Sequence, residues 1–193
     1  MAQLTQGSKA PAFKLAGNDG RTHTLAEKQG GKVVLFFYPK DHTPGCTTEA
    51  CDFRDNHARL VATGAAVLGV SRDSLASHDK FRDKYALNYP LLSDPDGSVH
   101  EAYGAWGEKL FYGKKIIGVI RSTFLIDEQG KVLQAWYGVK VNGHAEHVLA
   151  ALRGESAPAP AKKAPAKKAP AKKAPAKKAP AKKAPAKKAP ARK

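Results

Sequence analysis

Two cysteines, Cys46 and Cys51, are the only thiols in the 193-residue chain, and they lie five positions apart. Thr43 precedes the first of them by three positions, and Pro39 and Pro44 stiffen the segment that leads to it. Cys46 falls at the predicted start of a helix, where unpaired backbone N–H groups and the positive end of the helix dipole favour an anion. The pattern predicts a nucleophilic thiolate at Cys46. The alternative is that Cys46 is an ordinary small buried residue.

The spacing of the two cysteines limits how they can bond. On a regular helix five residues give a rise of about 7.5 Å and a rotation of about 140°, so the two Cα atoms would lie roughly 8 to 9 Å apart. A disulfide needs less than about 7 Å. If Cys46 is oxidised to a sulfenic acid and Cys51 condenses with it, the first one or two turns of the helix must unwind. The alternative is that Cys51 is a spectator and that a separate thiol reacts with Cys46.

Other kinds of cysteine site fit the spacing less well. Cys46, Cys51 and His42 could supply three ligands to a metal, but the cysteine spacing is wider than in typical zinc knuckles and there is no second cysteine pair. The usual dithiol oxidoreductase motif has two residues between its cysteines, whereas this chain has four. The spacing therefore counts against both a metal site and a disulfide reductase.

Arg121 is the candidate cation beside the thiolate. It lies within residues 120–127 and opens an otherwise apolar strand, where a solvated arginine would be out of pattern. A guanidinium there could donate hydrogen bonds to a thiolate and to peroxide oxygens together, and could stabilise the charge that shifts during oxygen transfer. The alternative is an edge arginine that pairs with a surface carboxylate.

The elements expected around these residues alternate between strands and helices. Residues 32–38 form a nearly continuous apolar run, which is typical of a central strand covered on both faces. We predict further strands at 65–70, 90–92, 119–127 and 132–137, a small hairpin within 13–25, and helices at 46–61, 74–85, 99–103 and 145–152. This order predicts an α/β fold of thioredoxin-like type, with a central mixed sheet flanked by helices.

The end of the chain has a different composition. From Ala157 onward it contains only Ala, Pro, Lys and one Arg, and the unit Ala-Lys-Lys-Ala-Pro is repeated six times in residues 161–190. This tail holds 14 of the 33 basic residues and none of the 17 acidic ones, so it accounts for most of the formal charge of +16. We predict one thioredoxin-like domain in residues 1–155 and a disordered basic tail in residues 156–193.

Export and membrane insertion have no support in the sequence. Residues 1–9 lack the apolar core of a signal peptide, and no run approaches the ~18 apolar residues of a membrane span. Two cysteines are an unusual structural staple in a reducing cytosol. We therefore expect a cytoplasmic protein in which the cysteines have a chemical role.

Residues 36–51, Phe-Phe-Tyr-Pro-Lys-Asp-His-Thr-Pro-Gly-Cys-Thr-Thr-Glu-Ala-Cys, closely resemble the Q-type peroxiredoxins, also called bacterioferritin comigratory proteins. Further matches are Gly-Val-Ser-Arg-Asp at 69–73, Leu-Ser-Asp at 92–94, Trp-Gly-Glu-Lys at 106–109, Tyr-Gly-Lys at 112–114 and Arg-Ser-Thr-Phe-Leu-Ile-Asp at 121–127. The matches follow one another in order and cover nearly all of residues 5–153.

The resemblance implies a thiol peroxidase that reduces hydrogen peroxide and organic hydroperoxides. The residues that match the family's peroxidase site are Pro39, Thr43, Cys46 and Arg121. Cys46 would be oxidised to a sulfenic acid, and Cys51 matches the resolving cysteine of those members that carry one in the same helix. The resemblance also implies thioredoxin or a similar dithiol as reductant and no metal, haem or flavin; we expect a monomer or weak dimer. Glu49 either supports Arg121 or is simply a first-turn acid favoured by the helix dipole.

The tail departs from this family and is similar to the Lys-Ala-Pro tails of linker histones and histone-like bacterial proteins. A proline every five residues prevents a continuous helix and favours an extended coil of up to ~100 Å. Its charges, without aromatic residues, suit sequence-independent contact of residues 161–193 with DNA or another polyanion, which would associate the protein with the nucleoid. The alternatives are a solvated tail without a partner and contact with anionic membranes or polyphosphate. For the whole chain, the second hypothesis is a nucleic-acid-binding protein on a thioredoxin-like scaffold.

Overall fold

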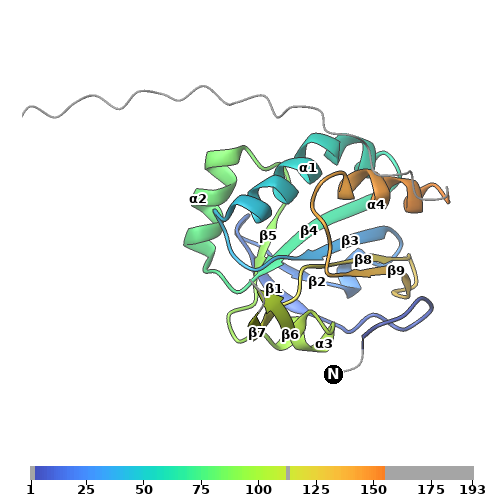
Figure 1. Ribbon diagram of the computed structural model, residues 1–193. Coiled ribbons are helices and arrows are strands. Elements are labelled where there is room, and N and C mark those ends of the chain that lie inside the picture. The colour runs from blue at the N-terminus through green and yellow to red at the C-terminus, as the bar shows by residue number, and fades with distance from the viewer. Residues whose placement is uncertain (1–2, 112–113, 155–193) are drawn as a thin grey trace, which may run out of the picture. The chain divides into compact units, whose positions relative to one another are not determined.

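A buried central strand organises the computed structural model, which describes residues 3–111 and 114–154 (Figure 1). β3 (Lys32–Phe37) pairs with parallel β4 (Ala65–Ser71) along one edge and with antiparallel β8 (Ser122–Ile126) along the other. Five of its six residues are buried, because strands cover both edges and side chains pack on both faces. The predicted central strand is confirmed.

The sheet around β3 has seven strands in the order β2-β1-β5-β4-β3-β8-β9. Its other members are β1 (Lys14–Gly17), β2 (Thr22–Thr24), β5 (Leu91–Ser93) and β9 (Val132–Tyr137). β3, β4 and β5 run parallel, whereas the pairs β1–β2, β1–β5, β3–β8 and β8–β9 are antiparallel. The sheet is therefore mixed, as the sequence predicts.

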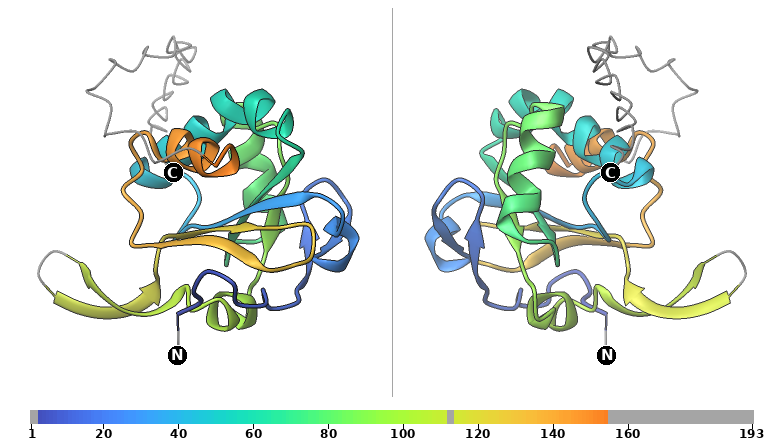
Figure 2. Two further views of the ribbon diagram at one scale, coloured as in Figure 1. Left: turned by 90° about the vertical axis from the view of Figure 1, so that its right-hand side faces the viewer. Right: turned by 90° about the vertical axis from the view of Figure 1, so that its left-hand side faces the viewer.

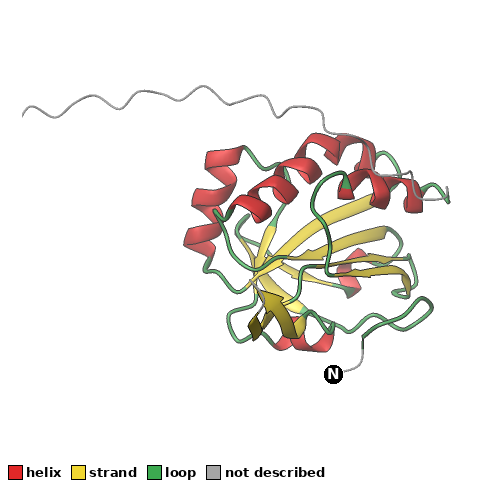
Figure 3. Cartoon of the chain, viewed as in Figure 1, coloured by secondary structure: helices red, strands yellow, loops and turns green. Residues whose placement is uncertain are grey.

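Helices cover the sheet unequally (Figures 1 and 3). The helices α1 (Pro44–Val61), α2 (Leu75–Tyr85) and α4 (His144–Leu152) lie on one face, the short helix α3 (Ser98–Ala102) lies on the other, and a 3₁₀ turn spans Ala26–Lys28. The alternation of side chains along β3 builds both layers of the core. Val34 and Phe36 pack with α1, α2 and α4, while Leu35 and Phe37 pack on the face of α3.

A second, two-stranded sheet projects from the body as a hairpin (Figure 2). It consists of β6 (Trp106–Phe111) and β7 (Lys114–Val119). The predicted strand 119–127 is therefore wrong at its start, since Val119 ends β7 and β8 begins only at Ser122. The sequence predicts no strand before Val119, because glycines and lysines interrupt the apolar pattern of the hairpin.

The two helices α1 and α4 are joined near the middle of α1. The backbone N–H of Ala145, in the first turn of α4, donates to the Asp52 carboxylate on α1 (3.0 Å). Arg59, two turns further along α1, forms an ion pair with Glu146. The second half of α1 is thus tied to a neighbour, whereas its first two turns lie before these contacts.

The other boundaries differ from expectation by a few residues. α1 begins at Pro44 instead of residue 46, because proline is favoured in the first helical turn; Thr43 occupies the N-cap position without a side-chain hydrogen bond to the helix. The predicted basic tail, residues 156–193, lies outside the described residues. Within the described part of the chain, no helix is both long and apolar enough to cross a membrane.

Candidate active site

Cys46 lies in the first turn of α1, just beyond the carboxyl end of β3. Thr43 is the N-cap residue with extended backbone, Pro44 opens the helix, and the N–H of Thr47 donates to the Thr43 carbonyl (2.8 Å). The Cys46 side chain is 2% exposed. The helix start supplies unpaired N–H groups and positive potential near the sulfur. The predicted position of Cys46 in the first turn of a helix is confirmed.

The guanidinium of Arg121 lies against the sulfur. Its Nη2 donates a hydrogen bond to Cys46 Sγ (3.2 Å), and its Nη1 pairs with the Glu49 carboxylate. Gly45 leaves room for it, since a Cβ atom at Gly45 would come within 3.4 Å of Nη2. Burial works against the charge of Arg121, yet Glu49 and Cys46 raise the pKa of this guanidinium above its usual range. A permanent cation therefore contacts the candidate nucleophile.

Glu49 completes this group from one turn further along α1. Its side chain is 1% exposed, and burial raises its pKa from 4.5 to about 7 against the opposing effect of Arg121. Its Oε1 atom is buried without a hydrogen-bond partner among the described residues. Of the two interpretations of Glu49, the contact with Arg121 is present in the structure. Glu49 is thus an acid that can exchange a proton near neutral pH.

Hydrogen bonds of Asp41 anchor the loop between β3 and α1. Its buried carboxylate accepts hydrogen bonds from Tyr38 Oη (2.8 Å) and Ser77 Oγ (2.7 Å) and lies 2.9 Å from His78 Nδ1. Burial opposes ionisation, but the bonds from His78, Ser77 and Tyr38 lower the pKa of Asp41. The backbone N–H of Asp41 donates to Asp73 Oδ2 (2.8 Å). Sequence reasoning missed this anchor, because nothing local marks an acid in a polar loop as buried.

Thr43 and Pro39 occupy this anchored loop. The Thr43 hydroxyl donates to the Lys40 carbonyl (2.9 Å), which leaves the lone pairs of its oxygen free to accept a hydrogen bond. Pro39 follows the end of β3 and is half-buried. Neither side chain forms a hydrogen bond with Cys46 among the described residues, and Thr43 is near it in the chain as the N-cap residue of α1.

Cys51 lies on the same helix and is half-buried, and both cysteines are free thiols. The helix is continuous from Pro44 to Val61, so the geometric limit on a disulfide applies to the folded state. Burial and the charge of Asp55 raise the pKa of Cys51 above 9.0, against the opposing charge of Arg54. Cys51 is therefore not poised to react while α1 is intact.

The metal-site alternative receives no support from His42. Its ring packs against Phe81 (5.1 Å) and Tyr85 (6.2 Å) of α2. In residues 3–111 and 114–154 there is no group of three or more His, Cys, Asp and Glu side chains that could hold a metal ion.

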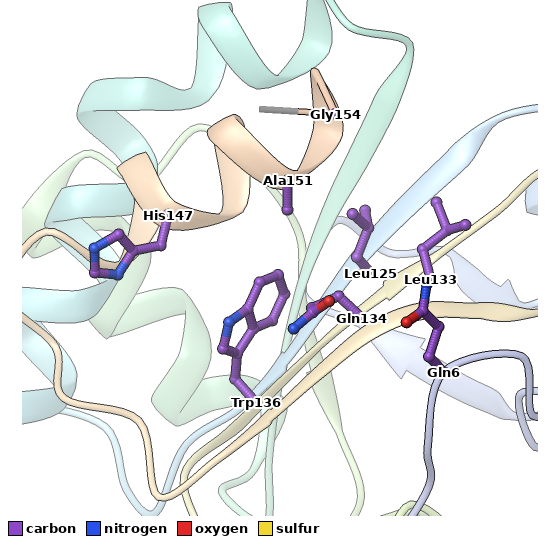
Figure 4. Close-up of a pocket in the computed structure, with 8 residues that line it drawn as sticks. All are labelled: Gln6, Leu125, Leu133, Gln134, Trp136, His147, Ala151 and Gly154. Atoms are coloured by element: carbon purple, nitrogen blue, oxygen red, sulfur yellow. The ribbon is translucent and has the colours of Figure 1, made fainter. Parts of the chain in front are cut away.

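A cavity of about 360 Å³ lies away from these residues, between the sheet and α4 (Figure 4). Its lining includes Gln6 and Leu125, with Trp136, His147 and Ala151 facing it from β9 and α4. None of the candidate site residues lines this cavity, so it does not enter the chemistry of the thiol.

Known proteins match the part of the chain that contains these site residues. The model of the AhpC/TSA family matches residues 6–135. A putative peroxiredoxin of Mycobacterium tuberculosis is 51% identical over 142 residues, which span 74% of this chain and 90% of that protein. Peroxiredoxin Bcp of Bacillus subtilis is 45% identical over 150 residues, spanning 78% of this chain and 96% of that protein.

Solved structures agree in fold. Peroxiredoxin Q of Xanthomonas campestris has a TM-score of 0.71 at 44% identity, covering 79% of this chain and 96% of its own. A second structure, with a TM-score of 0.71 at 43% identity and coverage of 79% and 97%, concerns the alkyl peroxide reduction activity of the bacterioferritin comigratory protein of that organism. These likenesses confirm the predicted thioredoxin-like fold.

Proposed function

Because the chain belongs to the AhpC/TSA family, among the peroxiredoxins of the Bcp or Q type, which are thiol peroxidases, we propose that Cys46 is its peroxide-reducing residue. The observation that carries this proposal is the hydrogen bond from Arg121 Nη2 to Cys46 Sγ (3.2 Å) at the start of a helix. The thiolate attacks one peroxide oxygen, an S–O bond forms as the O–O bond breaks, and the departing oxygen takes a proton to become water or an alcohol. The substrates are hydrogen peroxide and organic hydroperoxides.

The surrounding residues divide the work of this step. Arg121 donates to the sulfur in the resting site and stabilises negative charge as it moves onto the peroxide oxygens. Thr43 presents an acceptor oxygen to the peroxide proton, since its own hydroxyl proton is donated to the backbone carbonyl of Lys40. Pro39 stiffens the loop that carries Thr43, so the substrate meets an arrangement that needs little adjustment.

The second step joins Cys46 and Cys51. The sulfenic acid condenses with the Cys51 thiol, an S–S bond forms, and water leaves with the sulfenic oxygen. The intact helix holds the two Cα atoms roughly 8 to 9 Å apart, so its first turns must unwind before the sulfurs meet. A dithiol of the thioredoxin type then reduces the disulfide and regenerates both thiols.

Oxidation by one equivalent of peroxide tests both cysteines together. We expect an intramolecular Cys46–Cys51 disulfide, seen by intact-mass analysis as a loss of about 2 Da and mapped by peptide analysis. A Cys51→Ser chain serves as control and should gain an oxygen at Cys46 instead. Two free thiols after oxidation of the unaltered chain would contradict the proposed cycle.

Glu49 should make the unwinding step depend on pH. Its pKa is about 7 in the folded helix against an ordinary value of 4.5, so the helical state holds this proton more tightly than an unwound state does. The extra stability is fully present below pH ~4.5 and is lost as the pH rises through ~7. We therefore expect disulfide formation to accelerate by up to roughly 100-fold over this window.

The Glu49 prediction is checked by single-turnover kinetics of disulfide formation from pH 4.5 to 8. Glu49→Gln should flatten the profile, whereas exposed Glu101→Gln should leave it unchanged. The groups that act on Glu49 are Arg121 and Asp52. The thiolate fraction of Cys51, whose pKa is raised, grows with pH across the window in both chains, so the contribution of Glu49 is the difference between their profiles. If the profile of Glu49→Gln is unchanged, a group other than Glu49 causes the pH dependence.

For the basic tail we propose a second function, which is to hold the peroxidase near DNA or another polyanion. The six Ala-Lys-Lys-Ala-Pro repeats and the final Arg192 and Lys193 support it by their charge and lack of aromatic residues. The alignments with curated peroxiredoxins span at most 153 of the 193 residues in the eight comparisons. Binding of this kind would place the enzyme at the nucleoid.

A shift assay across a salt series tests the tail. The full chain should bind duplex DNA of any sequence, with an affinity that falls steeply as salt rises, whereas a chain ending at Glu155 should lose this binding. Peroxidase activity of the shortened chain is the control for folding. Binding that persists after truncation, or that does not depend on salt concentration, would contradict the proposed role of the tail.

A further inference from the structure

The β6–β7 hairpin leads directly into Arg121. β7 ends at Val119, and only Ile120 separates it from the arginine. The N–H of Ile120 donates to the Ala105 carbonyl (2.7 Å), which closes the base of the hairpin, and the Arg121 carbonyl accepts from the N–H of Val139 (3.1 Å). The placement of the guanidinium therefore depends on how the hairpin is held.

Lys109 on β6 reaches across to this base. Its Nζ donates to the Val119 carbonyl (2.7 Å), which lies two residues before Arg121. Its carbon chain crosses Gly118, where a Cβ atom would come within 3.4 Å of Lys109 Cε and 3.7 Å of its Nζ. A glycine at 118 thus provides the surface over which the lysine lies. Cross-strand register explains the approach, because Lys109 opposes Ile116 and Gly118 is the next residue on the same face of β7.

The charges of the site also act on the Lys109 ammonium. Burial and the charge of Arg121 lower the pKa of this lysine, while Cys46 raises it. The lysine is half-buried, so solvent screens these effects only in part. Lys115 on the same hairpin differs, because it is exposed and paired with exposed Glu108 (2.9 Å).

We propose that Lys109 is a positioning residue of the peroxidase site, which holds the Val119 carbonyl and hence Arg121 in place and adds a second positive charge that stabilises the Cys46 thiolate. The inference rests on the proposed role of Cys46 and adds a residue to it. A single guanidinium shared between Cys46 and Glu49 has part of its charge offset by the carboxylate. The Lys109 ammonium has no such carboxylate among its contacts in the described residues. Its positive charge makes up for the part of the Arg121 charge that Glu49 offsets.

Three variants test this role. Lys109→Met keeps the carbon chain and removes the charge, Lys109→Arg keeps the charge, and Lys115→Met removes a lysine from the other face of the hairpin. Two quantities are measured on the reduced full-length chain: the pH midpoint of thiolate formation, from ultraviolet absorbance, and the rate constant for reaction with hydrogen peroxide below that midpoint. Lys109→Met should raise the midpoint and slow the reaction about 3- to 10-fold.

The controls separate this role from a structural one. Lys109→Arg should stay within about twofold of the unaltered chain, and Lys115→Met should match it. If Lys109→Met shifts the thermal unfolding midpoint but not the thiolate midpoint, the lysine is merely structural and the proposal is overturned. Lys109→Gln provides the same two readouts if the methionine variant does not fold. Failure of the proposed function would look different, since Cys46→Ser would then still reduce peroxide.

Discussion

Replacing Cys46 with serine should lower the rate of peroxide reduction by at least about 1,000-fold. A serine hydroxyl at the start of α1 keeps the shape of the site but does not ionise near neutral pH, so no anion is available to attack the peroxide oxygen. The bond from Arg121 to position 46 has no negative partner in this variant. The measurement is consumption of hydrogen peroxide by the reduced chain under single-turnover conditions.

Cys51→Ser is the matched control, because the residue lies on the same helix and is only half-buried. Its first reaction with peroxide should keep the rate of the unaltered chain. Turnover with thioredoxin should fall to a small fraction, since no internal thiol forms the disulfide that thioredoxin reduces. Full activity of Cys46→Ser would contradict the proposal at its base, whereas sustained turnover of Cys51→Ser would remove only the resolving role of Cys51.

Arg121→Met should slow peroxide reduction about 100- to 1,000-fold, because it removes the donor that contacts the sulfur and stabilises the moving charge. Arg121→Lys should recover only part of this loss, since an ammonium cannot donate to Cys46 and pair with Glu49 in the planar geometry of a guanidinium. The rate constant for reaction with hydrogen peroxide is the readout. Arg59→Met, which removes an exposed arginine of α1, should leave it unchanged.

Stability has to be measured beside the rate, because Arg121→Met also leaves buried Glu49 without its cation. Glu49 should then bind a proton, since burial alone raises its pKa. A double variant with Glu49→Gln should recover thermal stability without recovering the reaction rate. Recovery of both by the double variant would show that Arg121 acts only on folding.

The sequence predicts the placement of Cys46 at the start of a helix well, because the signals are local. The apolar run of β3, the proline beside Thr43 and the first turn of a helix all lie within twenty residues of Cys46. Arg121 stands out as a charge that opens an otherwise apolar predicted strand. Its exact setting is not predicted, since it lies in the short segment between β7 and β8 and not at the start of a strand.

The parts that sequence reasoning misses depend on contacts between distant residues. Asp41 is 4% exposed because Tyr38, Ser77 and His78 satisfy its carboxylate, and two of these come from another helix. Nothing in the sequence distinguishes Lys109 from an ordinary surface lysine, whereas in the structure its side chain lies over Gly118. Neither burial nor pairing is encoded in the spacing of these residues along the chain.

The contact between Asp52 and Ala145 has a consequence for how the enzyme cycles. It lies one residue past Cys51 and joins α1 to α4, while buried Phe53 follows immediately in the core. Unravelling that starts at Pro44 would reach this contact after eight residues, and on the way it would break the hydrogen bond from Tyr89 Oη to the Ala50 carbonyl (2.8 Å). Each turnover would then include one local unfolding and one refolding event, so the free energy of unwinding eight residues of helix would enter the rate of the catalytic cycle.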